Sequence, residues 1–409
     1  MGLATARGVV LAVLLTGAVL LATRPVAAEP DSYPVATDVR LGGDDSQTRF
    51  ILDLSRKIDL HAFTLADPYR VVVDIPEVTF KLPPKAGESG RGLVKAFRFG
   101  LMMEGGSRIV LDLAKPARID KAYVMDASAG EPARLVLVLV ATDRESFLRK
   151  VAADDKTNVK VAAKPEPQPS NGDSRPVLVL DPGHGGIDTG TRAPGGEMEK
   201  DIVLDLAKRL QSRIEKSGKY RVVMTRTDDT FIPLAERVDI ARKAQASLFV
   251  SIHADSLPHR EGDAQGATVY TLSDKASDPE AAKVAEEENR ADVIAGIDLK
   301  SQPDDVAGIL VDLAERETKT FSIQFAHKLV AELKGVTRLH KDPIKSAGFR
   351  VLRAPDVPSA LVELGYVSNK DDLKSLMSDA WRNQMADSMA KAIDGYLSTH
   401  VAGAGTNAN

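Results

Sequence analysis

Two histidines each follow a short apolar run, and this arrangement restricts the fold more than any other feature of the chain. His184 lies in a glycine-rich turn after residues 177–180, and His253 follows the apolar residues 248–250. Short apolar runs bounded by turn residues are typical of buried strands. When such strands are parallel, their carboxyl ends meet at one edge of the sheet. We therefore expect a sheet that presents both imidazoles to one cleft.

Residues 177–400 alternate strand and helix patterns, which predicts an α/β domain with a mostly parallel sheet and flanking helices. Helical patterns lie between the strand candidates, and a last amphipathic helix covers 385–396. Residues 401–409 are interpreted as a flexible tail. The predicted strands are 177–180, 220–225, 247–252, 267–272, 349–352 and 360–364.

The region before this domain has a different pattern. Residues 31–148 contain several runs rich in β-branched residues and bounded by Pro, Gly or Asp, which predicts a small all-β, sandwich-like domain. Its single histidine, His61, stands alone and is interpreted as structural. Residues 149–176 include a Pro-rich polar stretch and are predicted to form an extended linker.

The first 28 residues predict a secretory signal peptide. Arg7 supplies a positive charge, an apolar run follows, and Val26 and Ala28 offer the small residues of a cleavage site. The alternative is an N-terminal membrane anchor, for which the apolar run is short. Without a twin arginine, the general secretory route is favoured. No other stretch predicts a membrane span, so we expect none after cleavage.

Composition limits the partners and the cofactors. The formal net charge is −4, which gives no reason to expect nucleic acid as a partner. The chain has no cysteine, so an exported form would have no disulfides. Any zinc site must therefore use His and carboxylate ligands.

Three residues can form such a metal site. His184 and His253 follow predicted strands, and Glu199 starts a helical pattern. Two imidazoles and one carboxylate leave a fourth tetrahedral position open for water, as in catalytic zinc sites. Glu363 lies within the predicted strand 360–364, where a charge is costly unless it has a partner or a role. It is either an ion-pair partner of an arginine such as Arg353 or a general base.

Residues 273–320 interrupt the alternation of strands and helices, and we interpret them as a regulatory helical insertion. Residues 279–294 predict one helix that starts at a proline. Val306, Ile309, Leu310 and Leu313 form a second apolar stripe at helical spacing. This stripe could dock a partner or pack on the rest of the domain.

Residues 176–400 resemble the zinc-dependent N-acetylmuramoyl-L-alanine amidases that separate daughter cells in Gram-negative bacteria. The matching segments are 180–186, 199–201, 251–255 and 354–369. Residues 36–140 resemble, less sharply, the AMIN-type module that often precedes such amidases and is thought to bind peptidoglycan at the division septum. The resemblance implies one zinc ion per catalytic domain, with His184, Glu199 and His253 as ligands and Glu363 as the catalytic base.

The resemblance also implies an autoinhibited periplasmic enzyme. In the family, a helix in the insertion lies over the zinc and a glutamate fills its open position. Among Glu286, Glu287 and Glu288, we favour Glu288 because it shares a face with Val284 and Ala285. A LytM-domain activator in the periplasm, at the septum, would displace the helix. We expect a monomer that acts on peptidoglycan. The alternatives are a zinc peptidase that cuts within the stem peptide and a non-catalytic wall-binding protein.

Overall fold

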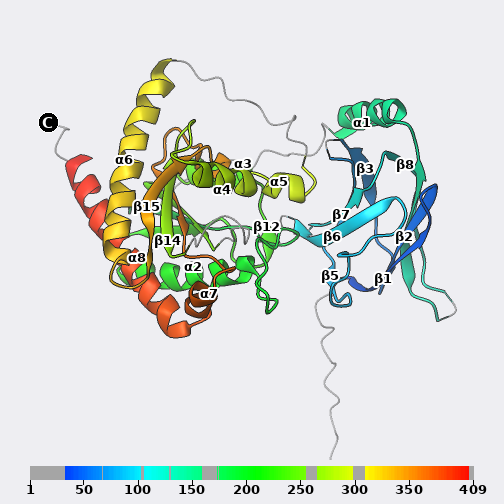
Figure 1. Cartoon of the computed structure of the whole chain (residues 1–409), viewed down its shortest axis with the longest axis horizontal. Helices are drawn as coiled ribbons and strands as arrows, with labels where there is room; N and C mark the ends of the chain where they lie inside the picture. The colour runs from blue at the N-terminus through cyan, green and yellow to red at the C-terminus, as the bar shows by residue number, and fades with distance from the viewer. Residues whose placement is uncertain are drawn as a thin grey trace, which may run out of the picture. The chain divides into compact units, whose positions relative to one another are not determined.

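The computed structural model describes residues 33–66, 68–102, 106–128, 130–158, 173, 175–254, 265–297 and 309–404 (Figure 1). Within these ranges the side chains of residues 152–158, 309–316 and 400–404 are outside the description. The predicted signal peptide and most of the predicted linker also lie outside the described residues. Among the helices described, none is long and apolar enough to cross a membrane.

Two sheets make up the N-terminal region and confirm its predicted β-rich character. The first has the order β5-β1-β2-β9-β8, and the second has the order β12-β6-β7-β4-β3. The elements are β1 (Val35–Gly43), β2 (Gln47–Leu54), β3 (His61–Leu65), β4 (Arg70–Pro76), β5 (Thr79–Phe80), β6 (Val94–Met102), β7 (Gly106–Leu113), β8 (Ala117–Met125), β9 (Ala133–Ala141), α1 (Arg144–Asn158) and, later in the chain, β12 (Thr230–Phe231).

The core of this region lies between its two sheets. Alternate residues of β2 and β9, such as Phe50 and Leu137, join alternate residues of β4 and β7, such as Val71 and Leu111, in one buried cluster. Period-two alternation puts one face of each strand into the core and explains the strand patterns in the sequence. Helix α1 occupies the first residues of the segment predicted as a linker from residue 149.

A six-stranded, mostly parallel sheet organises the C-terminal region, as predicted. Its order is β11-β10-β13-β16-β14-β15, and only the pair of β14 and β16 is antiparallel. Every residue of β10, β13 and β16 is buried, because helices cover both faces of a parallel sheet. The strands are β10 (Val177–Pro182), β11 (Arg221–Met224), β13 (Leu248–His253), β14 (Ala267–Leu272), β15 (Leu339–Ala347) and β16 (Ser359–Glu363).

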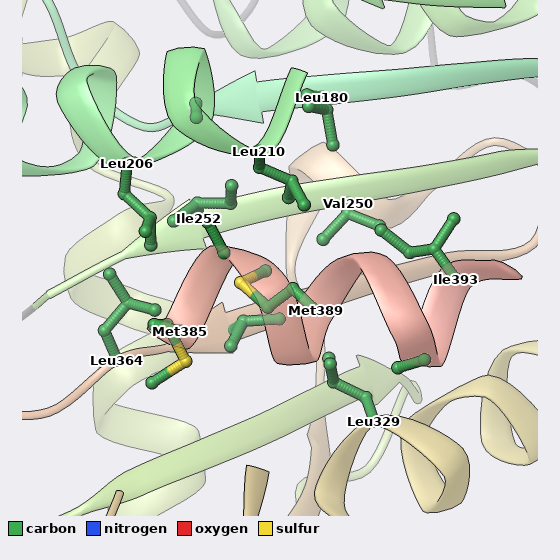
Figure 2. Close-up of a cluster of buried hydrophobic side chains, with 14 of the residues drawn as sticks. Leu180, Leu206, Leu210, Val250, Ile252, Leu329, Leu364, Met385, Met389 and Ile393 are labelled. Carbon is green, nitrogen blue, oxygen red and sulfur yellow. The ribbon is translucent and has the colours of Figure 1, made fainter. Parts of the chain in front are cut away.

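Separate helices cover the two faces of this sheet. On one face, α2 (Glu199–Lys216), α6 (Ile309–Leu333) and α8 (Asp379–Ala404) contribute to a large apolar cluster with Leu180, Val250 and Ile252 (Figure 2). On the other face, α3 (Leu234–Lys243) and α4 (Pro279–Glu288) join a second cluster with Val179, Phe249 and Leu361. The remaining helices are α5 (Ala291–Ile294), η2 (Arg350–Leu352) and α7 (Lys370–Leu376).

The structure differs from the sequence prediction at three elements. The strand expected at 349–352 is wrong, because Arg350–Leu352 is a 3₁₀ helix. The neighbouring strand β15 was not predicted, since its sequence contains Pro343 and three charged or His residues directly before it. The single helix expected at 279–294 is two helices, α4 and α5, with a break at Asn289 and Arg290.

Candidate metal centre

His184 reaches the site from a strained turn at the end of β10. Its φ angle is 58°, in the left-handed region that non-glycine residues adopt only at a cost of about 1–3 kcal/mol. Arg226 donates to the carbonyl oxygens of Pro182 and Gly183 at 2.9 and 2.7 Å, and Arg237 donates to that of His184 at 2.7 Å. Two buried guanidinium groups therefore hold three successive carbonyls and fix the turn.

Glycine is required next to His184 for steric reasons. A Cβ atom on Gly183 would lie 2.3 Å from Cε1 of His253, so any side chain there would collide with the imidazole ring. Gly190 has a φ of 60°, and a Cβ there would lie 2.6 Å from His184 and 2.7 Å from the Glu199 carboxylate. The glycines of this turn thus allow the three polar side chains to approach one another.

Glu199, the first residue of α2, is fully buried and held by backbone donors. The amides of Thr191 and Ala254 donate to its two carboxylate oxygens at 3.0 and 2.8 Å. Burial alone would raise the pKa of this carboxyl, but the adjacent His184 and His253 hold it well below its ordinary value. Glu199 is therefore an ionised, oriented carboxylate.

The structure brings His184, Glu199, His253 and Glu288 into one buried group. Their potential ligand atoms all lie within 4.8 Å of one another. His253 Nδ1 is 3.2 Å from His184 Nε2, 3.3 Å from Glu199 Oε1 and 3.0 Å from Glu288 Oε2. His184 Nε2 lies 3.1 Å from Glu199 Oε1 and 3.8 Å from Glu288 Oε2.

This group fits a metal ion by its chemistry. Imidazole nitrogens and carboxylate oxygens are the ligands of non-thiolate zinc sites. Burial would lower the pKa of His253, yet the charge of Glu288 and the hydrogen bond to Glu199 raise it to about 10. The neighbouring carboxylates therefore favour the protonated form of His253, and a bound cation would compete with that proton.

Supporting residues around the group were not predicted. Asp188 Oδ2 lies 2.9 Å from Nδ1 of His184, which leaves Nε2 facing the centre of the group. Asp181 accepts hydrogen bonds from Thr225 and Ser251 at 2.6 and 2.7 Å and pairs with Arg237 at 2.8 Å. Asp188 is four residues from His184 in the same turn, a signal that could have found it. The residues around Asp181 meet only in the folded sheet.

Glu363 is the last residue of β16 and lies at the register position beside His253 of β13. Its side chain is fully buried, although it is not one of the four grouped residues. Arg353, considered as its ion-pair partner, is exposed. The structure thus places Glu363 at the same sheet edge as His253.

Glu288 reaches the group from the last turn of α4. The helix starts at Pro279 with Asp278 as its N-cap, and its buried face carries Ala281, Val284, Ala285 and Glu288. Directly after it, the side chain of Asn289 donates to the Gly348 carbonyl and accepts from the Arg350 amide, at 2.9 and 2.8 Å. A small pocket beside the group is lined by Asp181, His184, Leu234, Arg237, His253, Glu288, Asn289, Ala291 and Val351.

Comparisons with known proteins agree with this geometry. Residues 178–395 match the family described as N-acetylmuramoyl-L-alanine amidase, and residues 38–139 match the AMIN domain. The chain is 35% identical to the N-acetylmuramoyl-L-alanine amidase AmiC of Escherichia coli, over 92% of this chain and 93% of that protein. It is 34% identical to AmiC of Neisseria meningitidis, over 94% and 96%. The amidase AmiA of E. coli is 38% identical over 56% of this chain and 81% of that protein.

Proposed function

Because the chain belongs to the N-acetylmuramoyl-L-alanine amidase family, we propose that it uses zinc to hydrolyse the amide between the lactyl group of N-acetylmuramic acid and L-alanine of the stem peptide. The buried convergence of His184, Glu199 and His253 carries this proposal, since their donor atoms lie within one coordination sphere. These three residues would hold the ion. When bound, zinc would polarise the scissile carbonyl and acidify water.

The chain's own residues do the remaining chemistry. Glu363 takes the proton of the attacking water and returns it to the leaving nitrogen of L-alanine. Glu199 stays ionised in its backbone hydrogen bonds, and Asp188 holds His184 in one tautomer. No covalent intermediate on the protein is required, because water is the nucleophile.

We further propose that α4 keeps the resting enzyme inactive. Glu288 is buried, and its carboxylate lies 3.0 Å from Nδ1 of His253, where it occupies space beside the three proposed ligands. Substrate and Glu288 cannot share this position. An activator has to displace the helix, and a periplasmic LytM-domain protein at the septum is the proposed partner. The stripe proposed to dock it, Val306 to Leu313, lies outside the side chains described.

We also propose that the chain acts in the periplasm, after removal of residues 1–28, during daughter-cell separation. The proposed domains are an AMIN-type module at 31–148, a linker at 149–176 and a catalytic domain at 177–400 that includes the regulatory insertion 273–320. We propose that the mature protein has no membrane span and no nucleic-acid partner. We propose that it acts as a monomer with one zinc ion.

The test of the reaction uses the zinc-loaded full chain with Glu288→Ala on purified peptidoglycan sacculi. Mass spectrometry of the products should show free stem peptides that begin at L-alanine, together with glycan strands without peptide. Stem peptides cut internally would replace the proposal with a peptidase. An unreacted polymer, from a protein that still binds zinc, would favour a non-catalytic wall-binding role. Glu363→Gln should remove the activity and keep the zinc.

The test of autoinhibition compares Glu288→Ala with Glu286→Ala, which removes an exposed carboxylate from the same helix. Hydrogen bonds to charged groups contribute about 1.5–3 kcal/mol, so loss of the Glu288 contacts should raise basal hydrolysis by about tenfold or more. Glu286→Ala should leave it unchanged. Equal basal rates for all three proteins would contradict the gating role of Glu288.

A further inference from the structure

A second charged contact holds α4, at the opposite end from Glu288. Glu280 Oε2 lies 2.9 Å from Nζ of Lys345 on β15, and Glu280 Oε1 lies 3.5 Å from Nε2 of His340 on the same strand. The helix N-cap Asp278 is 3.4 Å from the same Lys345 nitrogen. The first turn of α4 therefore lies against two basic side chains of the sheet.

Both basic side chains are buried. Lys345 is 3% exposed and His340 is 5% exposed, whereas Glu280 is 25% exposed. His340 Nδ1 lies 3.1 Å from both the amide nitrogen and the carbonyl oxygen of Asp342, which orients the ring with Nε2 toward Glu280. A buried ammonium group without an anion is strongly unfavourable. Displacement of α4 removes both of the ion-pair partners described for Lys345, and its ammonium group is then open to another anion.

Three aromatic side chains pack in the same buried cluster as the apolar face of α4. Tyr270, Phe349 and Tyr366 belong to the same buried cluster as Ala281, Val284 and Ala285 of α4. The Tyr366 hydroxyl lies 3.5 Å from Glu280. Burial raises the pKa of this hydroxyl, and the charges of Glu363 and Glu280 raise it further, so Tyr366 lies within electrostatic range of both carboxylates.

Two of the four carboxylates of α4, Glu280 and Glu288, contact side chains of the sheet. Glu280 and Glu288 are eight residues apart, which corresponds to about 12 Å along a helix. An extended peptide covers this distance with about three or four residues. The helix thus places the Glu288 carboxylate in the buried group around His253, which we call the metal-binding group, and the Glu280 carboxylate beside Lys345 and His340. The distance between the two carboxylates matches that within a short acidic peptide.

We propose that Lys345 and His340 form a subsite that binds a carboxylate of the substrate's peptide, about three or four residues from the scissile amide, once α4 has left. The proposal rests on the gating function proposed above. In the closed state Glu280 occupies the subsite as the substrate carboxylate would, while Glu288 occupies the position of the reacting group. In this proposal, α4 blocks the site and also imitates the charges of the substrate.

The experiment measures binding by calorimetry in the zinc-loaded full chain with Glu363→Gln, which stops turnover. Glu280→Ala and Glu288→Ala together open the site. The probes are an N-acetylmuramoyl tetrapeptide with free carboxylates at its third and fourth residues and the same compound with carboxamides there. Lys345→Met is added to the open protein, and Lys341→Met, an exposed lysine of the same strand, is the matched control.

We expect Lys345→Met to weaken binding of the carboxylate probe by about tenfold, equivalent to about 1.4 kcal/mol, and to leave the carboxamide probe unchanged. Lys341→Met should change neither probe, and Lys345→Arg should keep the preference for the carboxylate. His340→Gln tests the same preference if Lys345→Met does not fold. Equal affinities for the two probes in the open protein, or equal losses for both in Lys345→Met, would overturn the subsite.

The two proposals fail in different ways. If the closed protein, without the Glu280 and Glu288 substitutions, binds the probes as tightly as the open protein, the gating role of α4 is lost. The ratio of carboxylate to carboxamide affinity still reports on Lys345 in that case. No binding to the open protein would overturn the subsite itself.

Discussion

At the residue scale, Asp188 determines which nitrogen of His184 faces the metal-binding group. Its carboxylate lies 2.9 Å from Nδ1, and both side chains are buried. Loss of such a carboxylate partner costs about 10–100-fold in metal affinity. We expect Asp188→Asn to weaken zinc binding by that factor in competition with a chelator. Asp201→Asn, an exposed change nearby, is the control. Unchanged affinity in Asp188→Asn would show that the turn alone orients the imidazole.

Asp181 gives a prediction about pH. Burial would raise the pKa of its carboxyl, but Arg237 and the hydroxyls of Ser251 and Thr225 hold the pKa below the ordinary value of 3.8. A lowered carboxyl pKa contributes stability that is complete above the ordinary value and is lost as the pH falls through the lowered one. We therefore expect Asp181→Asn to destabilise the metal-free protein by about 3–5 kcal/mol at pH 7, since it leaves Arg237 buried without its anion.

The measurement is denaturant unfolding of the metal-free protein at several pH values. The difference between wild type and Asp181→Asn should shrink as the pH falls below about 3.8, because the wild-type ion pair is then lost as well. Asp379→Asn removes an exposed carboxyl whose pKa is also lowered, by Arg209, and should have no measurable effect. A difference that stays constant with pH would mean that Asp181 acts through its shape alone.

Sequence patterns pointed to the residues proposed to carry the chemistry more readily than to the residues around them. His184, Glu199, His253 and Glu363 each lie next to a strand end or a helix start, so local pattern placed them at one edge of the sheet. Arg226 and Arg237 hold the strained turn at His184 from more than 40 residues away. Contacts of this kind depend on the completed fold, and no local pattern indicates them.

At the element scale, polar contacts at both ends of α4 add to the packing of its buried apolar face. Asn289 makes two hydrogen bonds to the segment around Gly348 and Arg350, directly after Glu288. A hydrogen bond contributes about 0.5–1.5 kcal/mol net. We expect Asn289→Ala to raise basal hydrolysis of sacculi by about 5–30-fold, and to raise amide hydrogen exchange in α4. Glu286→Ala is again the control. Faster amide exchange in α4 without higher activity would show that greater mobility of the helix does not relieve inhibition.

The boundaries of α4 show how far local patterns extend. Pro279 predicted its start correctly, because proline fits the first turn of a helix, and the structure adds Asp278 as the N-cap. Its end at Glu288 was missed, since the residues after it retain a helical pattern and the break depends on the contacts of Asn289 with another segment. The strand β15 was missed for a related reason. Its pairing with β14 overrides a sequence with Pro343 and several charged residues.

At the scale of the whole molecule, the group of His184, Glu199, His253 and Glu288 lies among the elements of the parallel sheet, while the N-terminal sandwich has a core of its own. The sandwich core contains buried residues of β1, β2, β4, β6 to β9 and α1, whereas the clusters on the two faces of the parallel sheet are built on β10, β13 and β16. Phe63, Leu65, Val72 and Val110 of the N-terminal region join the cluster on the α3 and α4 face. The four grouped residues come from the turn after β10, from α2, β13 and α4. An ion bound by this group would therefore link elements of the parallel sheet to its helices.

This arrangement predicts a local effect of metal on stability. If zinc binds only the folded state, a free zinc concentration of 100 times Kd stabilises that state by about 2.7 kcal/mol. Amide exchange should therefore slow in β10, β13 and the first turn of α2 when zinc is added, and remain the same in β2 and β9. Hydrogen-exchange mass spectrometry with zinc or a chelator measures both regions in one sample. His184→Ala should abolish the effect, whereas equal protection of both regions would mean that they unfold as one unit.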